Sequence, residues 1–332
     1  MTLHIVTGGL QTTVQDLGRA GHQSQGIPVG GAMDLLALRV GNLLVGNNHG
    51  DAALEATLIG PAITFDQDTL IALTGADLDA SINGTPVPAW HPIFVPRGGT
   101  LRFGQPRLGC HVYVAAAGGI DVPLVFGSRS TYLRAHFGGY EGRALRSGDA
   151  VQVGVPSRLS ERMAASLRES GAVPAVARWS LGGLLRPRYG DDPTVRLLAG
   201  AHIGALSGDA RERFFSGTFR VSSSSDRMGY RLESVELALE APVELLSEGV
   251  VFGTVQLPPA GAPIVLMADR QTTGGYPRIG EVIGVDLPLI AQLKPGDRLR
   301  FRLVSLDDAQ RLYLAQEQEL AQARFAIGLR SF

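Results

Sequence analysis

Apolar runs in this chain are short, and Gly, Pro, Asn or Asp ends most of them within a few residues. These residue types form turns and end strands, because Gly and Asn accept left-handed backbone angles and Pro cannot donate to a ladder. With 43 Gly and 19 Pro in 332 residues, the pattern predicts a mainly β protein of many short strands. The regular strand-helix alternation of a doubly wound sheet is absent, so closed barrels or sandwiches are favoured. The clearest predicted strands are residues 63–65, 70–73, 111–115, 195–198 and 264–267.

Turn signals recur along the chain. Asn83-Gly84 is the residue pair most typical of a tight β-hairpin. A glycine turn followed by an alternating strand begins at Gly99, at Gly148 and again at Gly296, and the last two turns both continue with Asp. Because these last two units lie about one domain length apart, they suggest two related β domains.

Helical spacing of apolar residues is limited to a few segments. Residues 33–45, 157–170 and 307–326 carry it, so we expect a few helices among the strands. Asp307 or Asp308 is expected to cap the last of these helices.

The chain is expected to divide into two domains. Residues 171–180 contain Gly171, Pro174 and repeated Ala, which is typical of a linker. This places an N-terminal β domain at residues 1–170 and a C-terminal β domain, ending in a helix, at residues 181–332.

Composition excludes several classes of function. A net charge of −1 and a pI near 6.7 lack the basic footprint of a nucleic-acid binder. The seven His residues show no i, i+4 pair and there is one Cys, so no metal site is predicted. No run is long and apolar enough for a membrane span and no signal peptide is apparent, so we expect a cytoplasmic protein without membrane contacts.

The chain has a single lysine, Lys294, in the turn Lys-Pro-Gly-Asp. A P-loop requires a Gly-Lys-Ser/Thr ending, and covalent biotin requires an accessible lysine amine. We therefore expect neither covalent biotin nor P-loop binding of ATP on this chain.

The most informative polar segment follows the predicted strand 264–267. Asp269 and Arg270 come at the end of this apolar run, where charges must be paired or hydrogen-bonded. The segment continues with the neutral hydrogen-bonding side chains of Gln271, Thr272 and Thr273. Gly274 and Gly275 can turn their backbone amides inward as an anion nest, and Tyr276 follows at the rigid end of the segment. Such a loop suits a small planar substrate with a carboxylate or amide. An ion-paired turn that only joins two strands explains the same residues equally well.

Two further polar segments are candidates for the same site. One lies around Gly229 and contains Asp226, Arg227 and Tyr230. We expect these three residues to approach the 269–276 segment. Ser128, Arg129 and Ser130 form a third polar run, without the Gly-x-Ser-x-Gly pattern of a nucleophile elbow. Structural ion pairs Asp226–Arg227 and Asp269–Arg270 are the alternative interpretation.

Several motifs resemble those of one family, which includes the C subunit of 5-oxoprolinase, allophanate hydrolase subunit 2 and KipA and is also described as a biotin-dependent carboxyltransferase-like domain. They occur in the family's order along nearly the whole chain. The matching segments are TTVQDLGR (12–19), GAMD (31–34), LLVGN (43–47), GGIDVP and GSRST (118–131), SDRMGYRL (225–232), SEGV (247–250) and MADRQTTGGYP (267–277).

The resemblance implies two cyclophilin-like β-barrel domains and action within a complex. It implies a homologue of the 5-oxoprolinase B subunit, similar to KipI or allophanate hydrolase subunit 1, and an A subunit of the LamB/YcsF type. The implied reaction is the ATP-dependent opening of 5-oxo-L-proline to L-glutamate. The alternatives are a carboxyltransferase of a biotin-dependent urea-type carboxylase, and a non-catalytic KipA-like partner of a kinase inhibitor.

The chemistry of lactam opening favours one of these functions. A five-membered lactam is unreactive until its oxygen is phosphorylated, which is a use for ATP, and the site must then hold a carboxylate and a developing oxyanion. Arg270 and Arg227 are expected to supply that positive charge as planar forks, and Asp269 to orient Arg270 or act as a base. Because this chain is not fused to a biotin carrier or carboxylase, 5-oxoprolinase is favoured, with ATP used by the complex rather than held by this chain.

Overall fold

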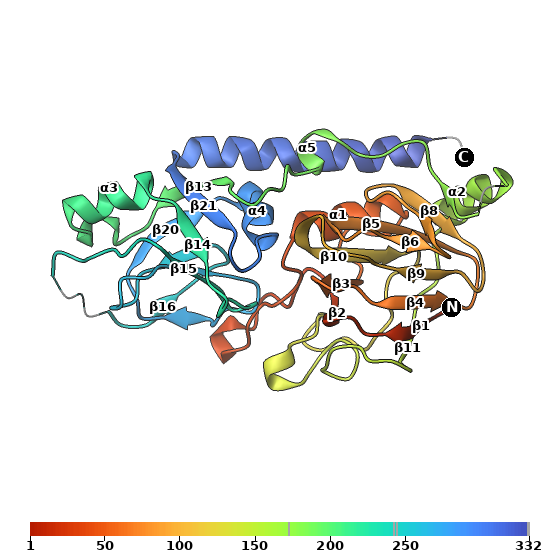
Figure 1. Cartoon of the computed structure of the whole chain (residues 1–332), viewed down its shortest axis with the longest axis horizontal. Helices are drawn as coiled ribbons and strands as arrows, with labels where there is room; N and C mark the ends of the chain where they lie inside the picture. Colours follow the sequence, from red (N-terminus) through yellow and green to blue (C-terminus); the bar gives the residue numbers. More distant parts are fainter. Residues whose placement is uncertain (172, 242, 244, 331–332) are drawn as a thin grey trace. The chain divides into compact units, whose positions relative to one another are not determined.

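The apolar runs form strands in a computed structural model that describes residues 1–171, 173–241, 243 and 245–330 (Figure 1). The chain divides into two compact units. The first contains residues 1–19, 30–187 and those from Gln318 onward, and the second contains residues 20–29 and 188–317. The mainly β fold class is confirmed, and all five of the clearest predicted strands are present.

The first unit contains two six-stranded sheets. One has the order β11-β1-β4-β9-β6-β7, with bounds β1 (Thr2–Thr7), β4 (Ala62–Phe65), β6 (Ser81–Ile82), β7 (Thr85–Pro86), β9 (Thr100–Arg102) and β11 (Ala150–Gln152). The other has the order β12-β8-β5-β10-β3-β2, with bounds β2 (Gln11–Gln15), β3 (Ala53–Thr57), β5 (Thr69–Asp77), β8 (Pro92–Val95), β10 (Leu108–Ala116) and β12 (Ala175–Val176).

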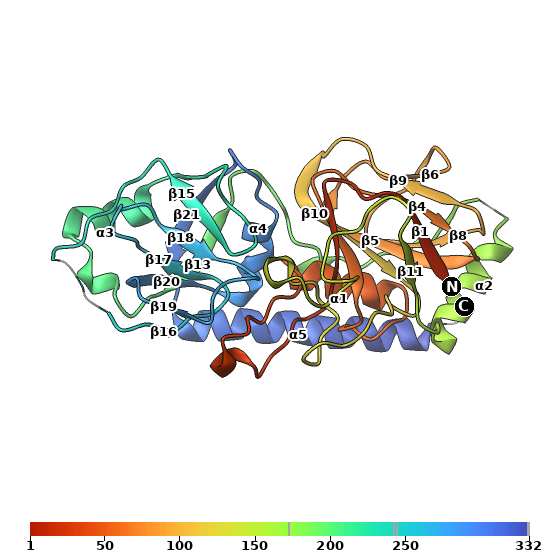
Figure 2. The same cartoon turned by 90° about the horizontal axis from the view of Figure 1, so that it is seen from below.

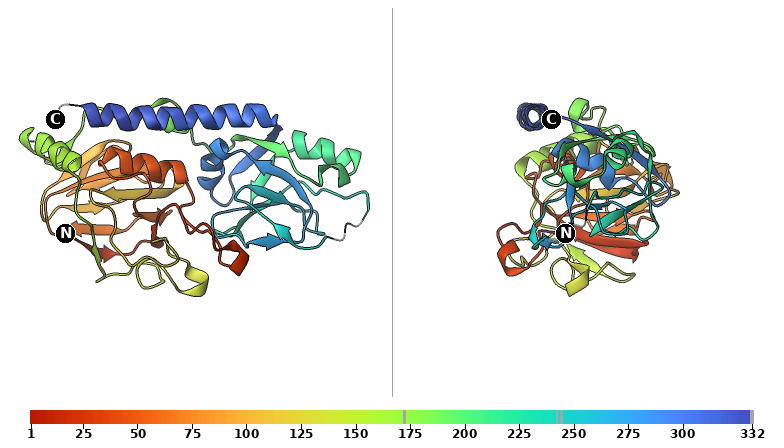
Figure 3. Two further views of the ribbon diagram at one scale, coloured as in Figure 1. Left: turned by 180° about the vertical axis from the view of Figure 1, so that it is seen from behind. Right: turned by 90° about the vertical axis from the view of Figure 1, so that its left-hand side faces the viewer.

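One apolar core joins the two sheets of this unit. Leu3 and Ile63 reach it from the first sheet, and Ile71, Ile93 and Val114 reach it from the second. Strands β5 and β10 are buried along almost their whole length, because helix α1 (Leu35–Leu44) packs against both of them (Figure 3). This explains why their sequences are continuously apolar rather than alternating.

Two helices of the first unit begin at the caps that their sequences provide. The Asp34 side chain accepts a hydrogen bond from the Ala37 amide at the start of α1, and Ser157 does the same for Ser160 at the start of α2 (Arg158–Glu169). The predicted helices over 33–45 and 157–170 are thus confirmed.

The second unit contains a closed seven-stranded barrel, visible in Figure 2. Its order is β13-β20-β17-β18-β15-β14-β21, with bounds β13 (Thr194–Ala199), β14 (Phe219–Val221), β15 (Gly229–Glu233), β17 (Thr254–Gln256), β18 (Ile264–Leu266), β20 (Arg278–Val282) and β21 (Arg298–Leu303). Phe214, Phe219 and Phe301 pack together in its core, with ring centroids 5.0 to 6.0 Å apart. A separate ribbon pairs β16 (Glu248–Gly249) with β19 (Thr273–Gly274).

The remaining helices are α3 (Gly208–Ser216), α4 (Leu287–Ala291) and α5 (Leu306–Leu329), with 3-10 turns η1 (Gln23–Gln25), η2 (Leu133–Ala135), η3 (Gly183–Leu185), η4 (Ile203–Ala205) and η5 (Gly284–Asp286). Helix α5 confirms the predicted C-terminal helix, but its cap differs. The Asp308 amide donates to the Ser305 hydroxyl, which in turn donates to the Asp308 carboxylate. Ser305 is therefore the cap, and Asp308 completes the reciprocal pair.

The boundary between the units also differs from the predicted one. Within the predicted linker 171–180, residue 172 lies outside the described residues, and β12 adds Ala175 and Val176 to the edge of the second sheet beside β8. Backbone hydrogen bonds to a sheet thus place this segment inside the first unit, which continues to Pro187. Helix α5 begins in the second unit and its C-terminal part is grouped with the first.

Candidate functional site

Two polar segments that lie far apart in the sequence are adjacent in the second unit. Strand β15 pairs antiparallel with β18, so that Tyr230 lies opposite Val265. The pairing continues past the strand ends, where the Asp269 amide donates to the Arg227 carbonyl at 2.8 Å. The segments around residues 226–230 and 267–270 are therefore neighbours, as the sequence led us to expect.

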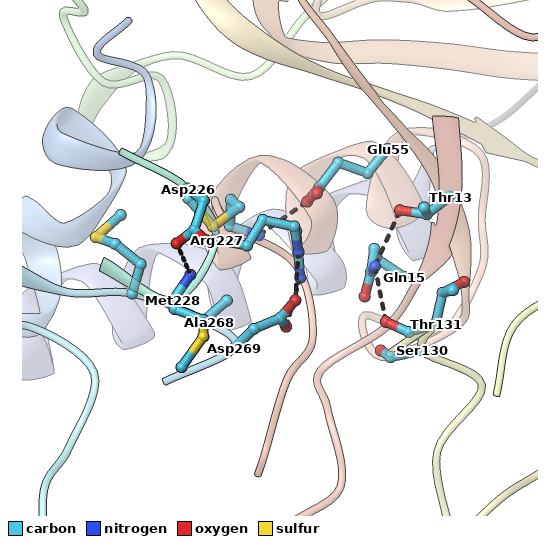
Figure 4. Close-up of polar contacts among 12 residues, drawn as sticks. Thr13, Gln15, Glu55, Ser130, Thr131, Asp226, Arg227, Met228, Ala268 and Asp269 are labelled. Atoms are coloured by element: carbon cyan, nitrogen blue, oxygen red, sulfur yellow. Dashed lines mark hydrogen bonds and ion pairs between the residues drawn. The ribbon is translucent and has the colours of Figure 1, made fainter. Parts of the chain in front are cut away.

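A buried ion pair joins these segments (Figure 4). Arg227 donates from Nε and Nη2 to the two carboxylate oxygens of Asp269 at 2.9 and 3.0 Å. The residues are 9% and 4% exposed, which makes this a planar two-point contact shielded from water. Neither pairing considered from the sequence, Asp226 with Arg227 or Asp269 with Arg270, forms; instead Asp269 orients Arg227, because the strand register places them face to face.

Arg270 is held quite differently. Its guanidinium makes only long contacts, at 3.4 and 3.5 Å, with the carbonyls of Met267 and Ala268, and it lies 5.7 Å from the centroid of the Phe252 ring. Nε is buried without a hydrogen-bond partner, and none of the described carboxylates forms an ion pair with this side chain. Burial lowers the pKa of Arg270 to about 10, with the nearby Asp269 charge opposing the shift. The Arg270 guanidinium therefore remains a cation at neutral pH, and its hydrogen-bonding capacity is only partly used by the protein.

Asp226 and Tyr230 have local tasks. The exposed Asp226 carboxylate accepts from the amides of Met228 and Gly229 at 2.8 and 3.3 Å, which forms an Asx turn before β15. Tyr230 is 5% exposed, and its hydroxyl donates to the Ala291 carbonyl in α4 at 3.3 Å. Both residues therefore stabilise the region that holds Arg227.

The residues after Arg270 form the ribbon rather than a nest. Gly274 pairs with Glu248 in β16, and neither Gly274 nor Gly275 has the positive φ that alternates with right-handed residues in an anion nest. Exposed Thr273 lies opposite Gly249, and the Thr272 carbonyl accepts from the Val250 amide at 3.2 Å. The expected nest is therefore absent, because ladder pairing extends the backbone there.

A pocket of about 980 Å³ adjoins the far end of this loop. Gly275 and Tyr276 belong to its lining, whereas Asp269, Arg270 and the residues through Thr273 do not. Its walls combine apolar and charged side chains, which include Leu237, Leu239, Leu257, Pro258, Arg213 and Glu240. We expected residues 269–276 to line one face of a single pocket. Instead, Asp269 and Arg270 lie outside the pocket, and Gly275 and Tyr276 line it.

Ser128 and Ser130 lie in the first unit, where their hydroxyls bind one carboxylate. Both donate to Asp16 Oδ1, at 2.6 and 2.5 Å, and the Arg129 amide donates to Oδ2 at 2.6 Å. All three groups are therefore engaged in closing the loop 128–130 onto Asp16. Arg129 itself forms an ion pair with Asp121 at 3.2 Å.

The same region holds a buried amide that the sequence pattern did not indicate. Gln15 is fully buried and donates from Nε2 to the Thr13 hydroxyl at 3.0 Å and to the Thr131 carbonyl at 3.3 Å (Figure 4). Its Oε1 has no partner among the described residues.

Polar residues on the barrel strands were also missed from the sequence. Gln256 is 1% exposed on β17, and Glu281 of β20 accepts a 2.7 Å hydrogen bond from Thr254. Burial raises the pKa of Glu281. The available signal was a polar residue within an otherwise apolar strand, as in Thr254-Val255-Gln256.

The described residues contain no group of three or more His, Cys, Asp or Glu side chains arranged to hold a metal ion. Among the helices they form, none combines the length and the apolar character that crossing a bilayer requires.

Known proteins similar to this chain agree with the resemblance seen in its motifs. The chain is 38% identical to the 5-oxoprolinase C subunit of Haemophilus influenzae, with 95% of each protein covered, and 38% identical to the 5-oxoprolinase C subunit of Escherichia coli, with 96% and 97% covered. The crystal structure of the Kluyveromyces lactis urea amidolyase superposes with a TM-score of 0.86 and 28% identity. That match covers 97% of this chain but only 20% of the larger protein.

The family described as carboxyltransferase domain, subdomain A and B, matches residues 25–303, which include both polar segments of the second unit, 226–230 and 267–276. The match therefore extends over most of both units rather than over one motif. The family expected from the sequence motifs is thus confirmed, and the chain belongs to the carboxyltransferase domain family of subdomains A and B.

Proposed function

We propose that this chain is the C subunit of an ATP-dependent 5-oxoprolinase and acts together with the A and B subunits of that enzyme. Its similarity to two proteins named as 5-oxoprolinase C subunits runs over nearly the full length of both partners in each comparison. By contrast, it matches only 17% of the urea amidolyase of Lachancea kluyveri. The overall reaction is 5-oxo-L-proline, ATP and water to L-glutamate, ADP and phosphate.

The state of Arg270 is the observation that carries the chemical part of this proposal. A half-buried guanidinium with a buried, unpartnered Nε and no ion pair is costly unless a ligand supplies the missing anion. Arg270 keeps its charge at neutral pH and presents a planar fork, which matches a carboxylate or a developing oxyanion. We assign it to one of these groups of the lactam substrate.

The Arg227–Asp269 pair supports Arg270 rather than sharing its task. Both oxygens of Asp269 accept from Arg227, so the carboxylate has little remaining capacity to act as a base. Asp269 directly precedes Arg270, and its amide is bonded to the other segment. The pair thus positions the backbone from which Arg270 projects.

ATP activates the lactam in this scheme. Transfer of the γ-phosphoryl group to the lactam oxygen releases ADP and gives an electrophilic imidate. Water then adds to the ring carbon, and cleavage of the carbon–nitrogen bond opens the ring to γ-glutamyl phosphate. A second water hydrolyses this acyl phosphate to glutamate and phosphate. Positive charge at the oxygen stabilises the phosphoryl transfer and the addition of water.

We assign ATP to the complex rather than to this chain alone, and we propose neither a bound metal nor covalent biotin here. Lys294 is the only lysine, and its ammonium donates to Asp297 at 2.7 Å while its amide donates to the same carboxylate at 3.0 Å. A lysine held in this turn is poorly placed to carry biotin or to reach a phosphate.

Substituting Arg270→Lys in the assembled complex tests the assignment, because lysine keeps the charge and loses the fork. We expect kcat/KM for 5-oxo-L-proline to fall by about 10²-fold or more, the scale of a lost oxyanion donor. Arg220→Lys, at the exposed pair with Glu233, is the matched control and should retain wild-type turnover. If Arg270→Lys assembles poorly while the remaining complex turns over normally, Arg270 is structural.

A second function has its own support in the urea amidolyase superposition. In it the chain would take part in moving a carboxyl group from carrier-bound biotin to urea. Parallel assays with 5-oxo-L-proline plus ATP, and with urea plus carboxybiotin, separate the two. Turnover of urea alone would replace the first proposal with the second.

A further inference from the structure

Gln256 is a buried amide whose hydrogen-bonding capacity is incompletely used. It is 1% exposed on β17, and its Nε2 has no partner among the described residues. A buried N–H without an acceptor destabilises the fold, so such groups are normally paired or absent. Its presence suggests that an acceptor arrives from outside the chain.

Gln271 is the only side chain that the described structure places in hydrogen-bond contact with this amide. Its Nε2 donates to Gln256 Oε1 over a long 3.4 Å, and its own Oε1 accepts nothing from the described residues. Two amides that face each other can form two hydrogen bonds, but here only one is made. Gln256 Nε2 is left as a donor and Gln271 Oε1 as an acceptor.

Gly274 lies next to the side-chain amides of Gln256 and Gln271. A Cβ atom at that position would lie 2.4 Å from Gln256 Nε2 and 3.3 Å from Gln271 Nε2. A side chain there would therefore occupy the space at the amide groups. Gln271 is half-buried, and Gly275 in the same loop is exposed.

We infer that Gln256 and Gln271 form a recognition slot for the edge of a cis amide, in which a ligand carbonyl accepts from Gln256 Nε2 and the adjacent ligand N–H donates to Gln271 Oε1. A cis amide presents its carbonyl and its N–H side by side, as a five-membered lactam does. Identifying the ligand as 5-oxo-L-proline rests on the proposed function. A lactone of the same shape has the carbonyl but lacks the N–H, so the slot discriminates against it.

Binding is measured first, apart from turnover. Titration calorimetry of the full chain, alone and in its complex, gives the Kd for 5-oxo-L-proline and for the corresponding γ-lactone carboxylate. We expect the lactam to bind at least about tenfold more tightly, because the lactone leaves the Gln271 acceptor unpaired. Absence of lactam binding to both the chain and the complex overturns the slot, whereas binding without ATP-dependent turnover supports the slot and contradicts the proposed function.

Two substitutions and one matched control test the residues. Gln256→Met keeps the length and removes the donor, and should weaken lactam binding about tenfold or more without lowering Tm. Gly274→Ala places a methyl group at the amides and should have the same effect on binding. Gly249→Ala lies opposite Thr273 in the same ribbon with no atom within 4 Å of its new Cβ, and should bind as wild type does.

These variants decide the question even if one of them fails to fold. Unchanged lactam affinity in a folded Gln256→Met protein overturns the slot. If that variant unfolds, equal affinities of Gly274→Ala and Gly249→Ala overturn it instead. A marked fall in Tm for Gln256→Met with unchanged affinity assigns the two amides to structure alone.

Discussion

Arg227 and Arg270 illustrate how two similar residues acquire different states. Each lies beside an aspartate in the sequence; Arg227 is buried and Arg270 is half-buried. Arg227 donates hydrogen bonds to both carboxylate oxygens of Asp269. Arg270 makes only long contacts with backbone carbonyls and lies over an aromatic ring. The strand register decides between them, because it turns the Asp269 side chain toward the opposite segment.

The buried pair should be sensitive to loss of one charge. Asp269→Asn removes the carboxylate charge that accepts two hydrogen bonds from the buried Arg227 guanidinium, and we expect it to lower the free energy of unfolding by about 3 kcal/mol. Glu233→Gln, at the water-exposed pair with Arg220, should have a much smaller effect, because solvent screens that pair. Urea denaturation of both variants measures the difference, and equal losses would show that burial of the Asp269 pair has no energetic consequence.

Glu281 should make stability depend on pH. Burial raises its pKa in the folded state above the ordinary value of 4.5. Its contribution to stability is therefore complete below that value and is lost as pH rises through the folded pKa. Relative to wild type, Glu281→Gln should gain Tm between pH 4 and pH 7, which thermal melts across that range measure.

Glu233 provides the opposite control for this experiment. Hydrogen bonds from Ser222 and then Arg220 lower the pKa of the exposed Glu233 carboxyl, so its contribution is lost as pH falls. Glu233→Gln should therefore lose Tm relative to wild type toward pH 7. The same trend in both variants would contradict the burial argument for Glu281.

At the level of elements, short side-chain and backbone contacts set the turns. Asp149 accepts from the Arg146 amide at 2.7 Å in the first unit, and Asp297 accepts from the Lys294 amide at 3.0 Å in the second. The two Gly-Asp turns recognised in the sequence therefore have the same local bonding. Each leads into a strand, β11 or β21.

The Asn83-Gly84 hairpin between β6 and β7 offers a test at this level. Both residues have positive φ, +51° and +81°, as a tight two-residue turn requires. Gly84→Ala meets no atom within 4 Å, so the expected loss of about 1 kcal/mol comes from backbone strain alone. Gly208→Ala at the start of α3 is equally unhindered without a positive φ and should not destabilise; equal effects on Tm would contradict the strain argument.

At the level of the whole molecule, the two units are interleaved in the sequence. Residues 20–29 are grouped with the second unit although they lie between parts of the first, and the end of α5 returns to the first. The family match spans both units. A fragment produced by cutting the chain at one internal position would therefore lack part of one unit.

The proposed function predicts dependence on partners. We expect the isolated chain to release no ADP in the presence of 5-oxo-L-proline, and its mixture with the A and B subunits to do so. Co-purification with the B subunit, followed by an ADP-release assay on each component and on the mixture, measures this. Full ATP-dependent turnover by the purified chain alone would contradict it.

The sequence by itself determined the mainly β class, the clearest strands, three helices and the family. These depend on local patterns, such as Asn83-Gly84 at a hairpin and Asp34 before α1, and on motifs that span most of the chain. The capping residue of α5 and the unit boundary were misplaced, because Ser305 competes with two neighbouring aspartates and because the strand pairing of β12 is a contact with distant residues.

Only the tertiary structure decided which polar side chains meet. The sequence indicated that the 226–230 and 267–276 segments are special, but not that Asp269 pairs with Arg227 and leaves Arg270 without a carboxylate. It also did not separate Ser130, bound to Asp16, from the loop of the second unit, or identify the amide of Gln256. The physical reason is that hydrogen bonds between side chains depend on strand register and burial, which residues many positions apart set together.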